Sequence, residues 1–422
     1  MNVRFGVLRF LRALSKDPSE RRRLAAAVHA LLDHRSRSLN ALDLFLRLLP
    51  TAGNAKLQLW QNLARCINDD YVQIASASDL SHLASAIRST QAYADASITL
   101  CHDRNGFLQR GFDYCTLREL WRLKPPEKLF VFHHFDPRGL LPHCWIEALL
   151  VLQTSGWQVV LSSSQLDSSV CEVLAPAGVK IARRANIGIC LGAYRDLALL
   201  LHSTPAVLRQ MKALVFCNDS NLLVQPPEAL VDQLERWTSG SGTELSDSQS
   251  KPKLSGLTDS FERQAYHLQS FLLHANRDLL RHPAWLRFWL NFAIDGSKDD
   301  LINQGEIGLS QSLLLAGVEL KTAYPLVKGL ITDPAMAEEL KGYGIAKPEN
   351  VNQSLFAWRS LLARGFPLVK KHVLFQLAEH QGQPLAIAEL ASLIPKERRV
   401  LLIRDIEQLL ISRFSRCSAR MS

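Results

Sequence analysis

Paired cysteines and long apolar runs are both missing from the 422-residue sequence. Its eight cysteines show no Cys-x-x-Cys spacing, which favours small core residues in a reducing compartment. No stretch approaches the roughly 18 uninterrupted apolar residues that a bilayer-spanning helix needs. Residues 1–35 also lack the apolar block and cleavage site of an export signal. We therefore expect a cytoplasmic protein, with any membrane contact at the inner face.

Common catalytic motifs are absent as well. The chain has no Gly-x-Ser-x-Gly elbow, no phosphate loop ending in Gly-Lys-Ser/Thr and no His-Glu-x-x-His. It also lacks an aromatic-basic RNA signature, finger spacing and a recognition helix. Despite the formal net charge of +9, we expect no nucleic-acid partner.

The positive charge is concentrated at the two ends of the chain. Residues 1–37 carry nine Lys and Arg side chains against three Asp and Glu, and residues 396–422 carry seven against three. Such runs are usually solvated surface. Apolar residues accompany the first arginines, a mixture that lets a short helix lie on an anionic membrane. Residues 1–37 therefore predict a peripheral membrane contact.

Apolar spacing divides the chain into three regions. Residues 1–124 predict a mostly helical region of unassigned role, which ends at the consecutive prolines 125 and 126. Residues 125–332 alternate short apolar runs with helical spacing, which predicts a mostly parallel sheet covered on both faces, with a flexible Ser/Gly-rich loop at 238–253. Residues 333–422 predict a C-terminal helical region. Strands are expected at 128–132, 157–162, 179–182, 213–216 and 254–257, and helices at 142–155, 170–174 and 193–201.

Seven blocks of the sequence occur in the order of a known family. They are LFVFHHFDPRG (129–139), ANIGICLGAYRD (185–196), LVFCNDS (214–220), LSGLTDSFE (254–262), YHLQSFLL (266–273), GEIGLSQSLLLAGV (305–318) and GFPLVKKHVL (365–374). In these blocks the chain resembles the rhamnan synthesis protein F family, and residues 1–120 are not covered.

The resemblance implies an α/β fold with a Rossmann-like, GT-A-type glycosyltransferase domain, flanked by helical N- and C-terminal regions. It also implies the reaction. A deoxyhexose, expected to be L-rhamnose, passes from a nucleotide-diphosphate donor to a growing cell-surface polysaccharide of the rhamnan or O-antigen type. The acceptor is a lipid-linked or polysaccharide chain. A transferase for another sugar, such as mannose or fucose, fits the same sequence.

A departing nucleotide diphosphate carries negative charge that a divalent cation or a fixed positive charge must neutralise. Asn218 and Asp219 follow the apolar run 213–216, at the carboxyl end of a strand, where open α/β sheets bind ligands. With the resemblance, Asp219 is the predicted ligand of Mg²⁺ or Mn²⁺, and Asn218 a predicted donor contact. The alternative is an Asx turn, which Asn-Asp-Ser commonly forms.

Further donor contacts are expected at the ends of two other strands. Asn186 and Gly188 precede a helix, where bare backbone amides can approach phosphate, and Arg183 and Arg184 supply charge nearby or lie on the surface. Asp136 is expected to contact the nucleotide or ribose, or to form the turn before the next residue, a proline.

Direct displacement with inversion needs a carboxylate base for the acceptor hydroxyl. Glu306 is the first candidate because it heads an apolar helix and matches an acidic position of the family; the alternative is a Glu that complements the helix dipole. Asp259 is the second candidate, and its alternative is a helix N-cap. His267 and Gln269 are expected to bond sugar or phosphate oxygens, or to be satisfied within the core.

Two observations limit these assignments. His133 and His134 suggest a metal site, but adjacent residues of a strand point to opposite faces, which argues against joint ligation. The family also carries an acidic residue within block 185–196, where this chain has Ile189, Cys190 and Leu191. A rival function follows from that departure and from the basic ends: a non-catalytic, glycosyltransferase-like binding or scaffold subunit of a polysaccharide assembly complex.

Overall fold

The computed structural model describes Phe112 and residues 114–239, 251–294, 297–345, 347 and 351–419. The expected N-terminal helical region, with its basic segment, lies outside these residues, except for its end, where α7 (Tyr114–Leu123) forms. Most of the Ser/Gly-rich loop lies outside them as well. Within the described ranges, no helix combines the length and the apolar character needed to cross a membrane.

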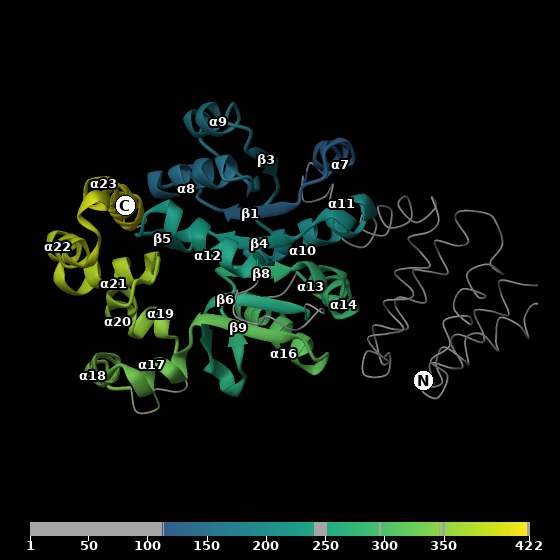
Figure 1. Ribbon diagram of the computed structural model, residues 1–422. Helices are drawn as coiled ribbons and strands as arrows, with labels where there is room; N and C mark the ends of the chain where they lie inside the picture. Colours follow the sequence, from purple (N-terminus) through teal and green to yellow (C-terminus); the bar gives the residue numbers. More distant parts are fainter. Residues whose placement is uncertain are drawn as a thin grey trace, which may run out of the picture.

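A single mixed sheet, eight-stranded within the described residues, forms the centre of the fold (Figure 1). The strand order is β3–β2–β1–β4–β8–β6–β7, and β9 pairs with β6. The first four strands are parallel, β8 is antiparallel to both β4 and β6, and β9 is parallel to β6. The α/β prediction is therefore confirmed. The strands are β1 (Lys128–His134), β2 (Gln158–Ser163), β3 (Lys180–Arg183), β4 (Ala213–Asn218), β6 (Lys253–Ser260), β7 (His267–Leu268), β8 (Leu272–Asn276) and β9 (Glu319–Tyr324).

Three strands run further than their apolar residues indicated. β1 continues to His134, β4 to Asn218 and β6 to Ser260. The extra residues are polar, so they carry no apolar signal, but backbone pairing with neighbouring strands holds them in the sheet. Among the candidate site residues, Asn218 and Asp259 lie on these polar strand ends, and Asp136 and Asp219 follow within two residues.

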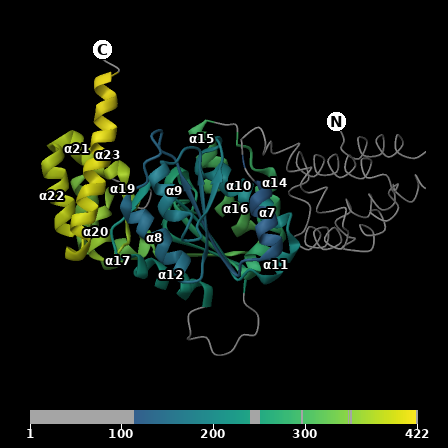
Figure 2. The ribbon, with the colours of Figure 1, turned by 90° about the horizontal axis from the view of Figure 1, so that it is seen from above.

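Helices cover both faces of the sheet (Figure 2). Along β1, Phe130 and Phe132 enter one hydrophobic core, and Leu129 and Val131 enter the other, as strand alternation requires. The first face is covered by α8 (His143–Thr154), α9 (Ser168–Leu174) and α12 (Pro227–Ser239). The second face is covered by α10 (Ile189–His202), α11 (Pro205–Gln210), α13 (Arg277–Arg281), α14 (Pro283–Asn291) and α16 (Gly308–Leu315), together with α7.

The C-terminal region packs against the first face of the sheet. Leu402 and Ile406 belong to the same core as Phe132, and Asp405 accepts hydrogen bonds of 2.8 Å from the backbone N–H groups of His143 and Cys144, which caps α8. The helices are α17 (Leu326–Thr332), α18 (Pro334–Gly342), α19 (Gln353–Phe356), α20 (Trp358–Ala363), α21 (Lys371–Gln381), α22 (Gln383–Leu393) and α23 (Arg399–Ala419).

One element corrects the prediction of a purely helical C-terminal region. β10 (Leu368–Lys370) pairs antiparallel with β5 (Asn221–Leu223), which directly follows the end of β4. Because the two paired strands lie far apart in the sequence, the spacing of nearby residues gives no signal for their pairing. This pairing brings the last of the seven sequence blocks to the carboxyl end of the parallel strands.

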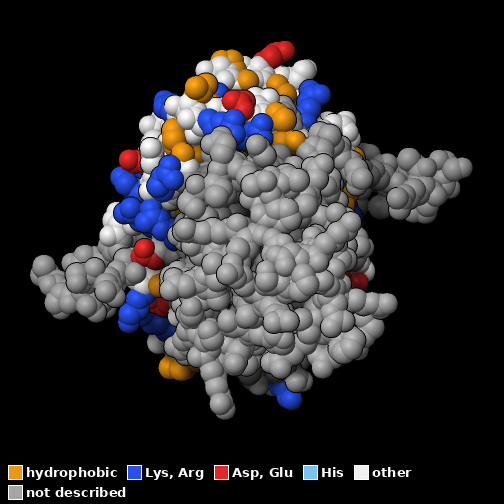
Figure 3. Space-filling model, turned by 90° about the vertical axis from the view of Figure 1, so that its right-hand side faces the viewer, with side chains coloured by type: hydrophobic (Ala, Val, Ile, Leu, Met, Phe, Trp, Pro, Cys, Tyr) orange, Lys and Arg blue, Asp and Glu red, His pale blue; other side chains and the backbone are white. Residues whose placement is uncertain are grey.

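The described surface also carries positive charge away from the chain ends. On the face shown in Figure 3, blue Lys and Arg side chains outnumber red Asp and Glu side chains over the described part. Over residues 38–395 as a whole the charges nearly cancel, with 33 Lys and Arg against 34 Asp and Glu, so these side chains form a local basic surface and the net charge of the chain comes from its two terminal segments.

Candidate functional site

The strand order reverses direction between β1 and β4. From β1 the chain proceeds outward to β2 and β3, and then returns across the sheet to place β4 on the other side of β1. Crevices at such a switch point, outside the carboxyl ends of the strands, are where open α/β sheets bind ligands. Here the register sets His133 beside Asn218, and His134 beside Ser163 of β2.

Asp219 stands at this switch point, one residue beyond β4. Its backbone N–H donates to the carbonyl of His133 over 3.1 Å, and its Oδ2 lies 3.1 Å from Lys371 Nζ. Burial opposes ionisation of Asp219, but Lys371 and the two neighbouring histidines outweigh it and hold the pKa of the carboxyl below its ordinary value. Asp219 is therefore an ionised carboxylate, with a side chain only 13% exposed.

Asn218 forms the Asx turn that the sequence left open. Its Oδ1 accepts from the backbone N–H and the hydroxyl of Ser220, at 3.0 and 2.6 Å. This turn fixes the direction in which Asp219 leaves the strand.

Lys371 reaches the site from the C-terminal region, and the sequence had assigned it no role. Its backbone N–H donates to the carbonyl of Ser220 over 3.0 Å, next to the β10–β5 pairing. The side chain of Lys371 is 15% exposed. Lys371 is also the first residue of the 11-residue helix α21. The sequence feature that could have identified Lys371 as a site residue is its position in the resembling block 365–374.

The two histidines of β1 have different surroundings, as strand alternation predicts. His134 contacts Ser163 Oγ through Nδ1 at 3.0 Å and the Leu140 carbonyl through Nε2 at 2.9 Å. His133 is buried, and burial lowers its pKa to about 4, so its ring is neutral at pH 7. Its Nδ1 has no well-formed hydrogen bond, although Asn186 lies nearby.

The segment after β3 carries Asn186 and Gly188 and is held by a buried ion pair. Arg184 Nε donates to Asp196 Oδ2 over 2.6 Å, and the same guanidinium donates to the carbonyls of Ala185 and Ile187. Arg184 is 2% exposed, so it fixes this segment rather than lying on the surface. Asn186 Oδ1 is buried within the segment without a hydrogen bond.

Gly188 is required by packing. It has φ +74°, and a Cβ there would lie 2.7 Å from Cβ of Ile294. The glycine therefore permits close packing against Ile294. The phosphate contact expected there from the sequence stays a prediction.

Cys190 lies near both carboxylates of the site, Asp219 and Glu306. It sits in the first turn of α10, close to Asn218, Asp219 and Glu306. Burial, and then the charge of Glu306, raise the pKa of Cys190 to about 12, so the thiol is neutral at pH 7. The position therefore supplies no negative charge.

Glu306 lies in a π-helical segment, Ile302–Ile307, that continues into α16. The prediction that it heads a helix is corrected, because α15 (Lys298–Leu301) and this segment precede it without a break. π-Segments are frequent at functional sites. Gly305 lets the segment approach α10, since a Cβ there would lie 2.5 Å from Leu191 Cδ1.

Two neighbours orient the Glu306 carboxylate. Ser270 donates its backbone N–H to Oε2 over 2.7 Å, and its hydroxyl donates to the same oxygen. His267 places Nε2 at 3.6 Å from Oε1, while its Nδ1 donates to the carbonyl of Ala265 over 2.8 Å. Ser270 occupies Oε2, so Oε1 is the Glu306 oxygen that an acceptor hydroxyl could donate to.

Lys370 supplies a second ammonium group, facing Glu306. Burial lowers its pKa, and the charges of Glu306 and Glu262 oppose that shift only in part. Its Nζ lies 3.4 Å from Asn352 Oδ1 and 5.6 Å from the centre of the Phe271 ring. The two successive lysines thus face the two carboxylates, Lys370 toward Glu306 and Lys371 toward Asp219.

Asp259 and Gln269 are engaged in structural contacts. Asp259 lies inside β6, so the expected N-cap of its own helix is not found; its Oδ1 instead accepts from the backbone N–H of Leu326 at 2.7 Å, which holds the start of α17. Gln269 Oε1 accepts from the hydroxyls of Thr258 and Ser354 at 2.7 and 2.9 Å.

Asp136 forms a turn at the end of β1. Its Oδ1 accepts from the backbone N–H of Arg138 over 2.8 Å, which matches the turn-forming alternative. Because this bond uses Oδ1, the contact with ribose stays a prediction for Oδ2 of Asp136.

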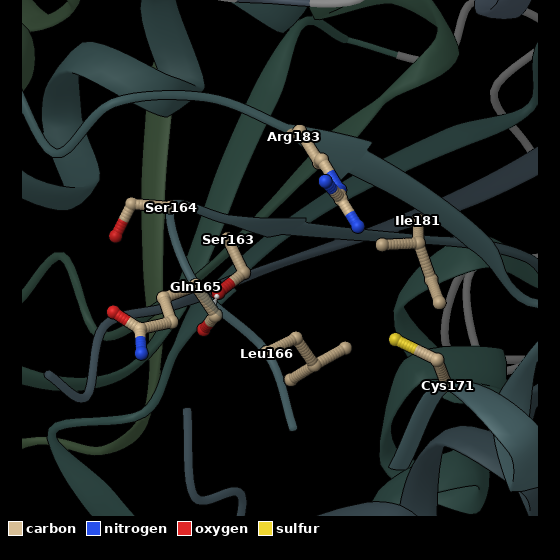
Figure 4. Close-up of a pocket in the computed structure, with 7 residues that line it drawn as sticks. All are labelled: Ser163, Ser164, Gln165, Leu166, Cys171, Ile181 and Arg183. Atoms are coloured by element: carbon tan, nitrogen blue, oxygen red, sulfur yellow. Dashed lines mark hydrogen bonds between the residues drawn. The ribbon is translucent and has the colours of Figure 1, made fainter. Parts of the chain in front are cut away.

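A cavity of about 340 Å³ lies at the carboxyl ends of β2 and β3 (Figure 4). Leu166 and Ile181 give it apolar walls, and the Arg183 guanidinium and the Cys171 Sγ point toward it. Ser163, which contacts His134 at 3.0 Å, connects the cavity to the switch point. Its volume and mixed lining suit a small, partly apolar ring system with polar substituents.

The residues around Asp219 fit a protein-held divalent ion poorly. Such an ion needs several oxygen or nitrogen ligands. Asp219 Oδ2 already pairs with Lys371, and both ring nitrogens of His134 are engaged. Across the described residues, no three His, Cys, Asp or Glu side chains are grouped so that they could hold a metal. No step below is assigned to Mg²⁺ or Mn²⁺.

Comparison with protein-family models and with curated proteins finds no match to this chain.

Proposed function

We propose that the chain is a glycosyltransferase with a GT-A-type domain, which transfers a deoxyhexose, L-rhamnose, from a nucleotide diphosphate to a growing surface polysaccharide. One observation carries the proposal: the ion pair of Asp219 with Lys371 and the pair of Glu306 with His267 both lie near enough to Cys190 that the two carboxylates affect its pKa. A charged group for the leaving diphosphate and a carboxylate base in one region of the molecule support this function. The resemblance in seven ordered blocks supports the same reading and names the sugar.

The donor is proposed to lie along the carboxyl ends of the parallel strands. Its nucleoside occupies the cavity beside Leu166, Ile181 and Arg183, and its diphosphate reaches the end of β4. His134 lies between these two places, bonded to Ser163 on one side and affecting the charge of Asp219 on the other.

Glu306 is the proposed base for an inverting displacement. An acceptor hydroxyl beside Oε1 of Glu306 gives its proton to the carboxylate as its oxygen attacks the anomeric carbon. The bond from that carbon to the phosphate oxygen breaks, and the nucleoside diphosphate leaves. Ser270 holds Oε2, so that Oε1 faces the acceptor.

The cellular setting is part of the same proposal. The cysteines Cys115, Cys144, Cys171, Cys190 and Cys217 are free thiols, which suits a reducing cytoplasm. Contact of residues 1–37 with an anionic membrane, where a lipid-linked acceptor would lie, stays a prediction.

Cys190 favours a second candidate function. A neutral thiol lies near both Asp219 and Glu306, within the block in which the resembling family carries an acid. If that acid is needed for turnover, the chain is a donor-binding scaffold subunit of a polysaccharide assembly complex.

Release of nucleoside diphosphate from a panel of donors, dTDP-rhamnose, GDP-mannose and GDP-fucose, tests the proposal in purified full-length protein. We expect release from one donor, and a loss of about 100-fold or more for Glu306→Gln, because a positioned base contributes about that much. Glu338→Gln is the control, since Glu338 is an exposed residue of α18. Binding of a donor without release by the wild type would support the scaffold subunit, and failure to bind any donor would contradict both functions.

A further inference from the structure

The ion pair at the switch point joins two parts of the chain that have separate anchors. Asp219 is fixed by its backbone bond to His133, and Lys371 by its backbone bond to Ser220. Neither side chain is more than 15% exposed. Long, exposed ion pairs are weakly held, but here both backbones are tied in place, so the ammonium group is presented at a defined position.

Other positive charge near this position is already engaged. Arg184 is buried, bonded to Asp196 and to two backbone carbonyls. Arg183 belongs to the cavity at the ends of β2 and β3, and Lys370 faces Glu306. Lys371 is therefore the cation that faces the end of β4.

Polar side chains besides Lys371 lie near Asp219. His133 Nδ1 and Asn186 Oδ1 are both buried, and Asn186 is the side chain that interacts with the His133 ring, although their geometry falls short of a full hydrogen bond. His133 also lies close enough to Asp219 to affect the pKa of its carboxyl.

We infer that Lys371 binds the diphosphate of the donor directly and that Asp219 is its counter-ion in the free protein, so that nucleotide binding requires no divalent cation. The inference rests on the proposed function. A diphosphate oxygen replaces the Asp219 carboxylate on Lys371 Nζ, and no covalent bond changes.

The direction in which Asp219→Asn changes nucleotide affinity distinguishes this inference from a metal site. If Asp219 holds a metal, Asp219→Asn removes a ligand and weakens nucleotide binding. If Asp219 only occupies Lys371, Asp219→Asn removes a competitor and a like charge, and binding stays the same or becomes tighter.

The test is calorimetric titration of the full-length protein with UDP, dTDP and GDP, each in EDTA and again in Mg²⁺. For the nucleotide that binds, we expect the same Kd within about threefold in both buffers, since no bound ion is lost. Lys371→Met should weaken the diphosphate by about 10- to 100-fold, the effect of one charge-assisted hydrogen bond, while the matching nucleoside binds unchanged. Lys371→Arg should restore part of the affinity. Lys341→Met, at an exposed lysine of α18, is the control.

The outcomes distinguish a failure of the role of Lys371 from a failure of the proposed function. Binding that disappears in EDTA, or that Asp219→Asn abolishes while Lys371→Met leaves it unchanged, overturns the role of Lys371 but leaves the proposed function standing. Thermal unfolding of each variant shows whether it is folded. If none of the three nucleotides binds the wild type in either buffer, the proposed function itself is contradicted.

Discussion

Ser270 donates both its backbone N–H and its hydroxyl to one oxygen of Glu306, 36 residues further along the chain. The backbone bond comes from the segment between β7 and β8, and Glu306 from a π-helical segment on the second face of the sheet. A carboxylate held in this way keeps one oxygen for structure and turns the other toward the site.

Ser270 should therefore act as a positioning residue. Ser270→Ala removes the hydroxyl bond and keeps the backbone bond, so we expect kcat to fall by about 10-fold with little change in the KM for donor. Ser270→Thr keeps a hydroxyl and should recover most of the activity. Steady-state kinetics of the three proteins measure the effect; equal losses of kcat in the alanine and threonine variants would contradict it.

Arg183 and Arg184 are adjacent in sequence and provide a matched pair. Arg184→Met removes the guanidinium that donates to the buried Asp196 carboxylate, and we expect a loss of about 3–5 kcal/mol in the free energy of unfolding. Arg183→Met, at an exposed side chain of the cavity, should change stability by less than about 0.5 kcal/mol but weaken nucleotide binding. Denaturant titration and calorimetry of both variants decide this. Similar stability losses in the two would contradict the assignment.

His274, on β8, predicts how stability depends on pH. Burial lowers its pKa to about 4 from an ordinary 6.5, so between these pH values the unfolded chain binds a proton that the folded protein does not. Stability should therefore decrease as the pH falls from 6.5 toward 4, by at most about 1.4 kcal/mol per pH unit for this group.

The variant His274→Gln, measured by denaturant titration between pH 7 and 5, should show a shallower decrease than the wild type. His380→Gln, an exposed position on α21, should keep the wild-type slope. An unchanged slope in His274→Gln would show that its ring does not contribute. His133 is expected to add a decrease of the same sign, because burial lowers its pKa to about 4 as well.

The position of Cys171 gives a chemical test of the nucleoside cavity. Its Sγ points toward the space beside Leu166 and Ile181 (Figure 4). A bound nucleoside diphosphate should slow alkylation of Cys171 by iodoacetamide, while exposed Cys115 reacts at the same rate with and without nucleotide. Mass spectrometry of the labelled peptides measures both rates. Equal labelling of Cys171 in both samples would place the nucleotide elsewhere.

The sequence predicts the parallel half of the sheet well and the rest of the fold less well. β1, β2 and β4 are buried on both faces, so each appears as a short apolar run. β8 contains the polar His274 and directly follows Phe271, so its start is not marked in the sequence. Its antiparallel position between β4 and β6 depends on pairing with strands far away in the sequence. Such pairing leaves no mark in local spacing.

The candidate site shows the same division. Asp219 and Glu306 could be selected because the resemblance marks their blocks, and the structure brings both close to Cys190. Lys370 and Lys371 also lie in a resembling block, but their position beside the two carboxylates depends on the three-residue strand β10, which the sequence did not predict. Asp259 has the local pattern of an N-cap, Thr-Asp-Ser, but β6 continues through it and directs its carboxylate to Leu326.

The most direct measurement of the central claim is an experimental structure of the protein with a bound nucleoside diphosphate or intact donor. The account predicts the diphosphate beside Asp219 and Lys371, the base in the cavity at the ends of β2 and β3, and the sugar within reach of Glu306. A nucleotide bound at any other surface, with the end of β4 free of phosphate, would contradict it.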